Sequence, residues 1–132
     1  MSSLTILAIG SGGFIGAVLR AYLNGLISHR VPHDLPYGTL GVNLIGSFLM
    51  GVLIAFFMYS SFFSMHTKSF LSTGLLGALT TYSTFAIESF LLLKAGHIFL
   101  SLLNISLNAF GSVIMAAGGF YLVKQIIKPL LK

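Results

Sequence analysis

Long apolar runs without charged side chains dominate the chain. Four stretches contain no Lys, Arg, Asp or Glu, and they cover residues 1–19, 35–67, 69–87 and 95–123. A helix needs about 20 such residues to cross the hydrocarbon core of a bilayer, whereas the strands of a membrane barrel are short and alternate in hydrophobicity. The pattern therefore predicts an all-α integral membrane protein, a single domain over 1–132 with transmembrane helices at about 4–27, 38–59, 69–93 and 98–123.

Composition and charge narrow the class of protein further. Of the 132 residues 56% are hydrophobic, 7% are charged and none is Cys. An average soluble domain is about a quarter charged, so a water-soluble enzyme and a disulfide-linked secreted domain are both excluded. The net charge is +5, but Lys124, Lys128 and Lys132 follow the last predicted helix at a spacing of four, which suits lipid head groups. We therefore expect the lipid bilayer, and no nucleic acid, as a partner.

The charges give only a weak indication of orientation. Four spans place both termini and the predicted loop at 60–68 on one side, with four lysines there against three positive residues on the other side. Positive residues favour the cytoplasmic side. This small difference allows insertion in both orientations, and it equally allows one orientation with the termini in the cytoplasm.

Small residues and one arginine share a face of the first helix. Gly12, Gly16 and Arg20 follow one another at a spacing of four, and residues four apart lie on the same side of a helix. Glycines at this spacing allow close packing by another helix. A guanidinium within a span needs a partner, a water-filled vestibule or a route to the interface.

Polar side chains form a stripe on two of the other helices. Thr39, Asn43 and Ser47 are four apart on the second, and the fourth repeats the spacing with Asn104, Asn108 and Ser112. Buried amides and hydroxyls need hydrogen-bond partners. Two interpretations remain open: the stripes bond to neighbouring helices, or they line a path for a small polar solute, where neutral donors suit an anion.

The third helix has a composition that disfavours a continuous helix. Residues 74–85 read GLLGALTTYSTF, and both glycine and threonine weaken helices. We predict a break at about 77–81, where exposed carbonyls can ligate a cation. Tyr82, Phe85 and Glu88 follow at a spacing of three, and the edge of an aromatic ring is electropositive, which favours an anion.

Three of these segments resemble motifs of the CrcB/Fluc fluoride channels. They are residues 12–20, 38–46 and 77–85, while the fourth helix agrees more loosely around Gly111 and Ser112. The resemblance covers nearly the whole chain. It implies an antiparallel, dual-topology homodimer in the cytoplasmic (inner) membrane of a prokaryote. It also implies a passive, fluoride-selective channel that exports fluoride from the cytoplasm and reduces its toxicity.

The resemblance also implies roles for individual residues. The carbonyls of Gly77 and Thr80 would hold a structural sodium ion at the dimer centre, Arg20 would lie at a vestibule mouth, and Glu88 matches an acidic residue of the third helix. Tyr82 is a departure, because the family has phenylalanine there. The residues expected along the fluoride path are Asn43, Tyr82, Phe85 and Ser112, with Thr81, Ser83 and Thr84 as weaker candidates.

Two other functions fit the helices less well. A small dual-topology, proton-coupled exporter would use Glu88, the one acidic residue within a predicted span, but the chain has no Trp for an aromatic cation cage. A structural or holin-like membrane protein would not explain the polar stripes. An enzyme is not expected, because the histidines lie in or beside loops without Cys or carboxylate neighbours of the kind that metal sites use; they are His29, His33, His66 and His97.

Overall fold

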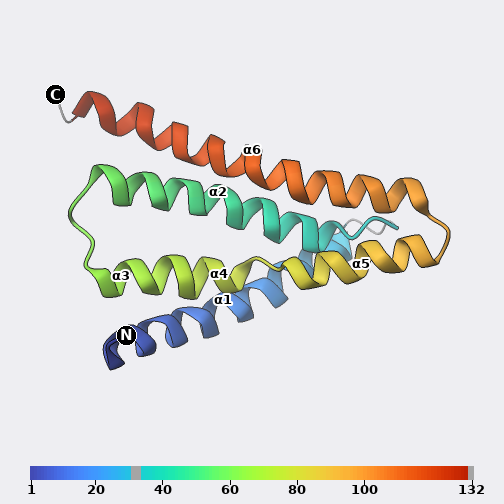
Figure 1. The fold of residues 1–132 in the computed structure, drawn as a ribbon, viewed down its shortest axis with the longest axis horizontal. Coiled ribbons are helices and arrows are strands. Elements are labelled where there is room, and N and C mark those ends of the chain that lie inside the picture. The colour runs from blue at the N-terminus through green and yellow to red at the C-terminus, as the bar shows by residue number, and fades with distance from the viewer. Residues whose placement is uncertain (31–33, 131–132) are drawn as a thin grey trace.

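The computed structural model describes residues 1–30 and 34–130, and these residues form helices joined by short turns (Figure 1). Within these described residues, four segments are long and apolar enough to cross a membrane, which confirms the prediction of a four-helix membrane protein. The elements are α1 (Ser3–Arg30), α2 (Tyr37–Tyr59), α3 (Met65–Ser69), the π-helix η1 (Phe70–Leu76), α4 (Gly77–Leu79), α5 (Tyr82–Lys94) and α6 (Ile98–Leu130).

Three of the helices extend further than the sequence predicted. α1 continues to Arg30, and the third span already begins at Met65, where the hydroxyl of Ser64 caps the helix by accepting a hydrogen bond from the Thr67 N–H. α6 continues past residue 123 to Leu130. Polar and basic residues are adequate helix formers, so a helix continues beyond the apolar run that crosses the bilayer.

Parts of the first predicted turn and of the basic C-terminal segment lie outside the described residues. Residues 31–33, which include His33, and Lys132 lie outside the described residues, as does the side chain of Lys128. Lys124 lies within α6 rather than after a helix. His29, His66 and His97 are exposed, in agreement with their interpretation as surface residues.

The helices run along one common long axis (Figure 1). α2 packs along α6, η1 packs on α1, and α5 packs on α6. The start of α1, the end of α6 and the connection between α2 and α3 lie at one end of the bundle, while the turn between α5 and α6 lies at the other. That turn contains Gly96 at φ 85°, a conformation that glycine adopts readily.

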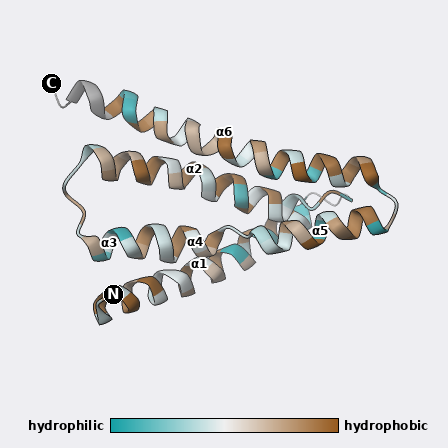
Figure 2. Ribbon diagram, in the orientation of Figure 1, coloured by the Kyte–Doolittle hydropathy of each residue, from teal (hydrophilic) through white to brown (hydrophobic). Residues whose placement is uncertain are grey.

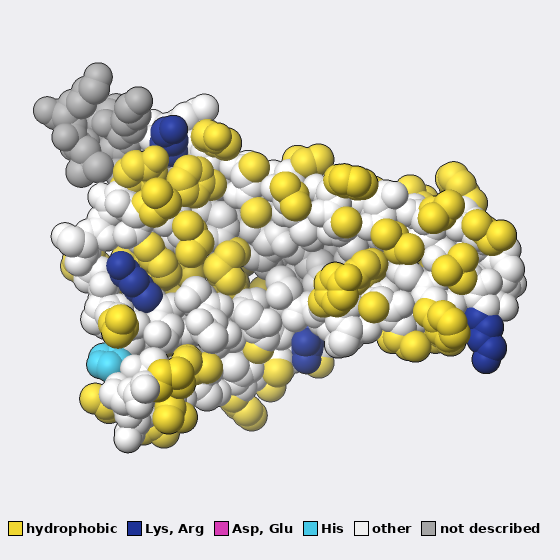
Figure 3. Space-filling model, in the orientation of Figure 1, with side chains coloured by type: hydrophobic (Ala, Val, Ile, Leu, Met, Phe, Trp, Pro, Cys, Tyr) yellow, Lys and Arg dark blue, Asp and Glu magenta, His cyan; other side chains and the backbone are white. Residues whose placement is uncertain are grey.

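Hydrophobic residues recur along every helix (Figure 2), and hydrophobic side chains are spread over the length of the bundle on the face that Figure 3 shows. Large side chains such as Phe14, Phe99 and Phe110 point outward and are at least 70% exposed. A water-soluble monomer rarely exposes contiguous apolar surface on this scale. The surface therefore matches a lipid environment, and the protein is a multi-pass membrane protein.

Glycines allow the closest helix contacts. A Cβ atom on Gly12 would collide with the carbonyl oxygen of Phe70, and one on Gly16 would collide with that of Leu75. The small-residue face of α1 is therefore a packing surface, as predicted, and it lies against η1. Gly119 of α6 approaches the backbone of α2 in the same way, at the carbonyl of Phe48.

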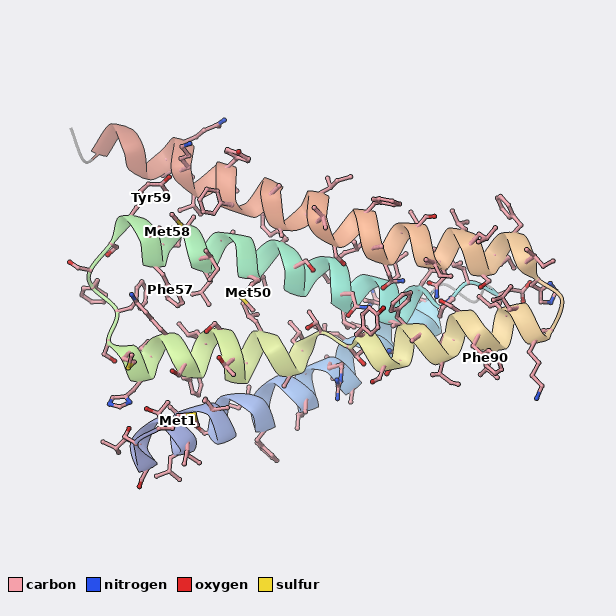
Figure 4. All side chains as sticks on the ribbon, in the orientation of Figure 1. Met1, Met50, Phe57, Met58, Tyr59 and Phe90 are labelled. Atoms are coloured by element: carbon pink, nitrogen blue, oxygen red, sulfur yellow. The ribbon has the colours of Figure 1, made fainter. Side chains whose placement is uncertain are left out.

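Aromatic and basic side chains gather where the spans end. Figure 4 shows Phe57, Met58 and Tyr59 on the last turn of α2. The Lys68 Nζ atom lies 5.3 Å from the centre of the Phe57 ring, and the Lys124 Nζ atom lies 5.5 Å from that of Tyr121. Aromatic rings and lysines are typical of the membrane–water interface, so this end of the bundle matches the head-group region.

Candidate functional site

The third span is not helical at two residues. α4 ends at Leu79 and α5 begins at Tyr82. Between them Thr80 (φ −82°, ψ 158°) and Thr81 (φ −148°, ψ 109°) have extended backbones. The last bond of the preceding helix runs from the Thr80 N–H to the Leu76 carbonyl, at 3.3 Å. The backbone groups that follow must find partners outside the helix.

The side chain of Asn43 supplies those partners. Its Oδ1 atom accepts a hydrogen bond from the Thr81 N–H at 2.7 Å, and its Nδ2 atom donates to the Thr81 carbonyl at 3.1 Å. The same Nδ2 donates to Oδ1 of Asn108 at 2.8 Å. Asn43 is 7% exposed, so it joins α2, the extended segment and α6 in a buried position.

The polar stripe of α6 continues this network. Asn108 Nδ2 donates to both the backbone oxygen and Oδ1 of Asn104, at 3.0 Å each. Asn104 Nδ2 donates to the Ser89 hydroxyl at 2.9 Å, and that hydroxyl donates to the Phe85 carbonyl at 2.8 Å. Much of the stripe therefore bonds to neighbouring helices, which was one of the two interpretations of the sequence.

The hydroxyl of Thr81 caps α5. It donates to the Thr84 hydroxyl at 2.8 Å and accepts from the Thr84 N–H at 3.4 Å. A side-chain oxygen in this position satisfies a free N–H of the first turn. The start of the helix also carries partial positive charge. The cap thus places a helix N-terminus beside the extended segment.

A cavity of about 410 Å³ lies against the extended segment. It brings together five of the residues predicted for the fluoride path and adds Ser47 and Asn108, which belong to the polar stripes. Ser83 and Thr84 are not among the residues that line it. The lining residues are Asn43, Ser47, Thr80, Thr81, Tyr82, Phe85, Ile105, Asn108, Ala109 and Ser112.

Two aromatic rings form part of the cavity wall. The rings of Tyr82 and Phe85 have centres 5.0 Å apart and planes inclined by 77°, so one ring presents its edge to the face of the other. Phe85 is 8% exposed, whereas Tyr82 is 80% exposed. The wall therefore combines a buried ring with a ring on the outer surface of the chain.

Arg20 meets the extended segment from α1. Its Nη1 atom donates to the Thr80 carbonyl at 3.3 Å. The guanidinium therefore has a hydrogen-bond partner within the protein. This is one of the three possibilities that the sequence left open for an arginine within a span. A carbonyl oxygen has two lone pairs, so this bond leaves the Thr80 oxygen able to accept one further contact.

The backbone at the break can offer oxygen ligands to a cation. In a continuous helix the Gly77 carbonyl would accept the Thr81 N–H, four residues later. Here that N–H bonds to Asn43 instead. The carbonyl of Gly77 is thereby released from its usual helical partner, and carbonyl oxygens are ligands that hard cations accept. The residues fit a cation site.

Glu88 is not among the residues that line the cavity of about 410 Å³. Its Oε1 atom accepts a hydrogen bond from the Thr39 hydroxyl at 2.7 Å, and Thr39 accepts one from Asn24 at 3.2 Å. Oε2 is buried and has no hydrogen-bond partner among the residues that the structure describes. Glu88 and Asp34, the two acidic residues of the chain, line a second cavity of about 260 Å³.

Two features of this region were not predicted from the sequence. The π-helix η1 leads directly into α4, and π-helical turns are frequent near functional sites. Asn108 was recognised as part of a stripe but not as a residue of the site. The spacing of residues within the fourth helix did not relate Asn108 to Asn43. The signal that could have identified Asn108 was the amide side chain that both polar stripes share.

Comparison with known proteins gives a consistent result. Residues 7–120 match the family described as CrcB-like protein, Camphor Resistance (CrcB). The chain is 78% identical over 128 residues to a protein of Sulfurimonas denitrificans named "Fluoride-specific ion channel FluC", with 97% of this chain and 99% of the relative covered. Proteins of the same name from Nautilia profundicola and Campylobacter lari are 51% and 48% identical, and the matches cover 94% and 91% of this chain and 97% and 98% of the relatives.

These relatives are named as ion channels, which are transporters and not enzymes. The family model and the high identities confirm the resemblance that the three sequence motifs carried. The match extends over almost all of each chain, so the whole four-helix unit is shared. The chain belongs to the CrcB family of membrane proteins.

Proposed function

We propose that this protein is a fluoride-selective, passive ion channel that exports fluoride from the cytoplasm and so reduces its toxicity. The observation that carries the proposal is the cavity of about 410 Å³ at the extended segment, whose wall combines neutral polar groups with aromatic rings. The names of the relatives support fluoride as the ion.

The lining suits a small anion that has lost part of its water. Ser47 and Ser112 bring hydroxyl groups to the cavity, and hydroxyls are neutral donors that an anion accepts. The aromatic rings of Tyr82 and Phe85 have electropositive edges. The start of α5 adds the partial positive charge of a helix N-terminus. None of these groups carries a negative charge that would repel an anion.

The proposed assembly is an antiparallel homodimer with dual topology. A cavity wall that includes a tyrosine 80% exposed on the outside of the subunit supports it, because a second copy would enclose that wall. The nearly balanced positive charges at the two ends of the bundle are compatible with insertion in both orientations. The residues along the proposed fluoride path are Asn43, Tyr82, Phe85 and Ser112, with Thr81, Ser83 and Thr84 beside them.

A structural sodium ion belongs to this proposal. The carbonyls of Gly77 and Thr80 would hold it at the dimer centre, with Arg20 at the vestibule mouth. The bond from the Thr81 N–H to Asn43 supports the site, because it releases the Gly77 carbonyl from the helix. A fixed cation contributes positive potential to a neighbouring anion path.

The proposed location is the cytoplasmic membrane of a prokaryote. The apolar surface supports a bilayer environment, and the relatives come from Sulfurimonas, Nautilia and Campylobacter, which are prokaryotes. Export across this membrane would remove fluoride that entered as the neutral acid and dissociated inside the cell.

Efflux from liposomes tests the function directly. Purified protein is reconstituted into vesicles loaded with fluoride in one set and with chloride in the other, and release is followed with ion-selective electrodes. The expected result is rapid release of fluoride without release of chloride. Equal release of both ions, or release of neither, would contradict a fluoride-selective channel.

The comparisons do not favour the exporter that would use Glu88, since the relatives are named as channels. They give no support to a structural or holin-like protein either. A proton-coupled exporter would need a pH gradient, whereas a channel needs only a gradient of fluoride.

A further inference from the structure

The amide of Asn108 on α6 is joined to the extended segment through a single residue, Asn43. We infer that Asn108 is a positioning residue. By holding the Asn43 amide in one orientation, it keeps the Thr81 N–H directed away from Gly77 and so keeps the Gly77 carbonyl available to a sodium ion. The inference rests on the sodium site of the proposed function.

Two oxygen atoms compete for the Thr81 N–H. A helical N–H donates to the carbonyl four residues earlier, which for Thr81 is the carbonyl of Gly77. The Oδ1 atom of Asn43 takes that donor at 2.7 Å. Without this acceptor, a buried Thr81 N–H would lack a partner, which is costly, and the Gly77 carbonyl would be the nearest acceptor by helical geometry.

The orientation of the Asn43 amide depends on its hydrogen-bond partners. Its oxygen and nitrogen have nearly the same shape, so the partners decide which atom lies where. Oδ1 faces the Thr81 N–H, while Nδ2 faces two oxygens, the Thr81 carbonyl and Asn108 Oδ1. Rotation of the amide by half a turn would set donor against donor and oxygen against two oxygens. Asn108 thus increases the preference for the observed orientation.

Asn108 is itself held in place by hydrogen bonds. Its Nδ2 atom donates to two oxygens of Asn104, and Asn104 donates in turn to Ser89, whose hydroxyl donates to a backbone carbonyl. In this series each side chain donates its hydrogen bond to the next residue, from Asn43 through Asn108 and Asn104 to Ser89. Asn104 is 0% exposed and Asn108 is 5% exposed, so water has little access to replace a lost partner. The orientation of the Asn43 amide is therefore set from α5 and α6.

One consequence is a link between the two ion sites. Asn43 and Asn108 both line the cavity proposed for fluoride, and the same Asn43 oxygen releases a carbonyl for the cation. A change at Asn108 should therefore alter sodium binding even though its side chain supplies no ligand to the ion.

Sodium-dependent thermal unfolding tests this inference. The detergent-purified protein is heated in increasing NaCl, with choline chloride added to keep the ionic strength constant. A ligand that binds only the folded state raises the unfolding temperature, so the half-saturating sodium concentration can be read from the series. In Asn108→Leu, which removes the acceptor but keeps the size, this concentration should rise about tenfold, as expected for one lost hydrogen bond.

A matched control separates this effect from a general loss of stability. Ser101 is also buried on α6, and its hydroxyl donates to the Ser89 carbonyl at 2.7 Å. Ser101→Ala should lower the unfolding temperature in choline chloride but leave the half-saturating sodium concentration unchanged. If Asn108→Leu does not fold, Asn108→Ala removes the same oxygen with a smaller side chain.

Two outcomes would overturn the inference. One is a half-saturating sodium concentration in the Asn108 variants equal to that of the wild type. The other is a wild-type protein whose unfolding temperature does not depend on sodium. Fluoride efflux measured on the same preparations shows separately whether the proposed channel function stands in either case.

Discussion

The carboxamide of Asn43 pairs with both backbone polar groups of Thr81, accepting from its N–H at 2.7 Å and donating to its carbonyl at 3.1 Å. A side chain of α2 thus takes the place that a neighbouring turn of helix would have taken. The pairing satisfies the extended backbone inside the membrane, where unpaired groups are costly. It also fixes Asn43 at the wall of the cavity.

Replacing Asn43 by Asp should abolish fluoride flux. A carboxylate keeps an acceptor for the Thr81 N–H but turns its second oxygen towards the Thr81 carbonyl and Asn108 Oδ1, where Nδ2 now donates. It also places a negative charge beside an anion path. Loss of buried hydrogen bonds and this repulsion together should lower efflux from liposomes about 100-fold or more.

Asn24→Asp is the control for that charge. Asn24 also lies in a span and donates to Thr39 at 3.2 Å, but it does not line the fluoride cavity. It should retain far more flux than Asn43→Asp. Wild-type flux in Asn43→Asp would remove Asn43 from the fluoride path.

The two aromatic residues of the cavity should respond differently to substitution. Tyr82→Phe keeps the ring that packs edge to face with Phe85, and Tyr82 is 80% exposed, so flux should stay within about twofold of the wild type. Phe85→Ala removes a buried ring and should lower flux about tenfold or more, since an aromatic contact and its packing are lost. Initial rates of fluoride efflux measure both, and a large loss in Tyr82→Phe would show that the hydroxyl takes part in conduction.

Neighbouring glycines of α6 provide a test of helix packing. A Cβ atom on Gly119 would collide with the backbone carbonyl of Phe48, whereas one on Gly118 would meet nothing within 4 Å. Gly119→Ala should therefore destabilise the protein by about 1–3 kcal/mol, and Gly118→Ala should be neutral or slightly stabilising because alanine favours a helix. Thermal unfolding in detergent compares the two, and equal stability would contradict the close contact of α2 with α6.

Substitution of Glu88 distinguishes a channel from an exporter. Glu88→Gln keeps an oxygen to accept the Thr39 hydroxyl but cannot carry a proton. In a channel, fluoride should still move down its own gradient in this variant, with the pH equal on both sides of the vesicle. Protein-free liposomes are the control, because the neutral acid crosses bilayers unaided. Transport that stops without a pH gradient would support the exporter.

Much of the fold could be predicted because it depends on simple patterns. Four uncharged runs predicted the four spans, and the spacing of Gly12 and Gly16 predicted a packing face that the structure places against η1. Several residues that the structure brings to one cavity could be named in advance as well. Asn43, Phe85 and Ser112 line one cavity although they come from different helices.

Other features could not be read from the chain because they depend on contacts between distant residues. The amides of Asn43 and Asn108 meet through helix packing, which residue spacing within either helix does not determine. The partner of Arg20 is a backbone oxygen, of Thr80, and every residue has such an oxygen. The helix ends also extend further than predicted, because hydropathy marks the hydrocarbon core rather than the last hydrogen-bonded turn.

The π-helix η1 has a consequence for insertions and deletions in the third span. A π-helical turn closes its hydrogen bonds five residues apart instead of four, so it accommodates an additional residue over the same length of span. Deleting one residue from Phe70–Leu76 would allow an ordinary α-helix, in which each residue accounts for about 100° of rotation. Because the π-helical turns already take up one extra residue, this deletion would leave the segments before and after η1 in nearly their present rotational phase, and Thr81 could still face Asn43.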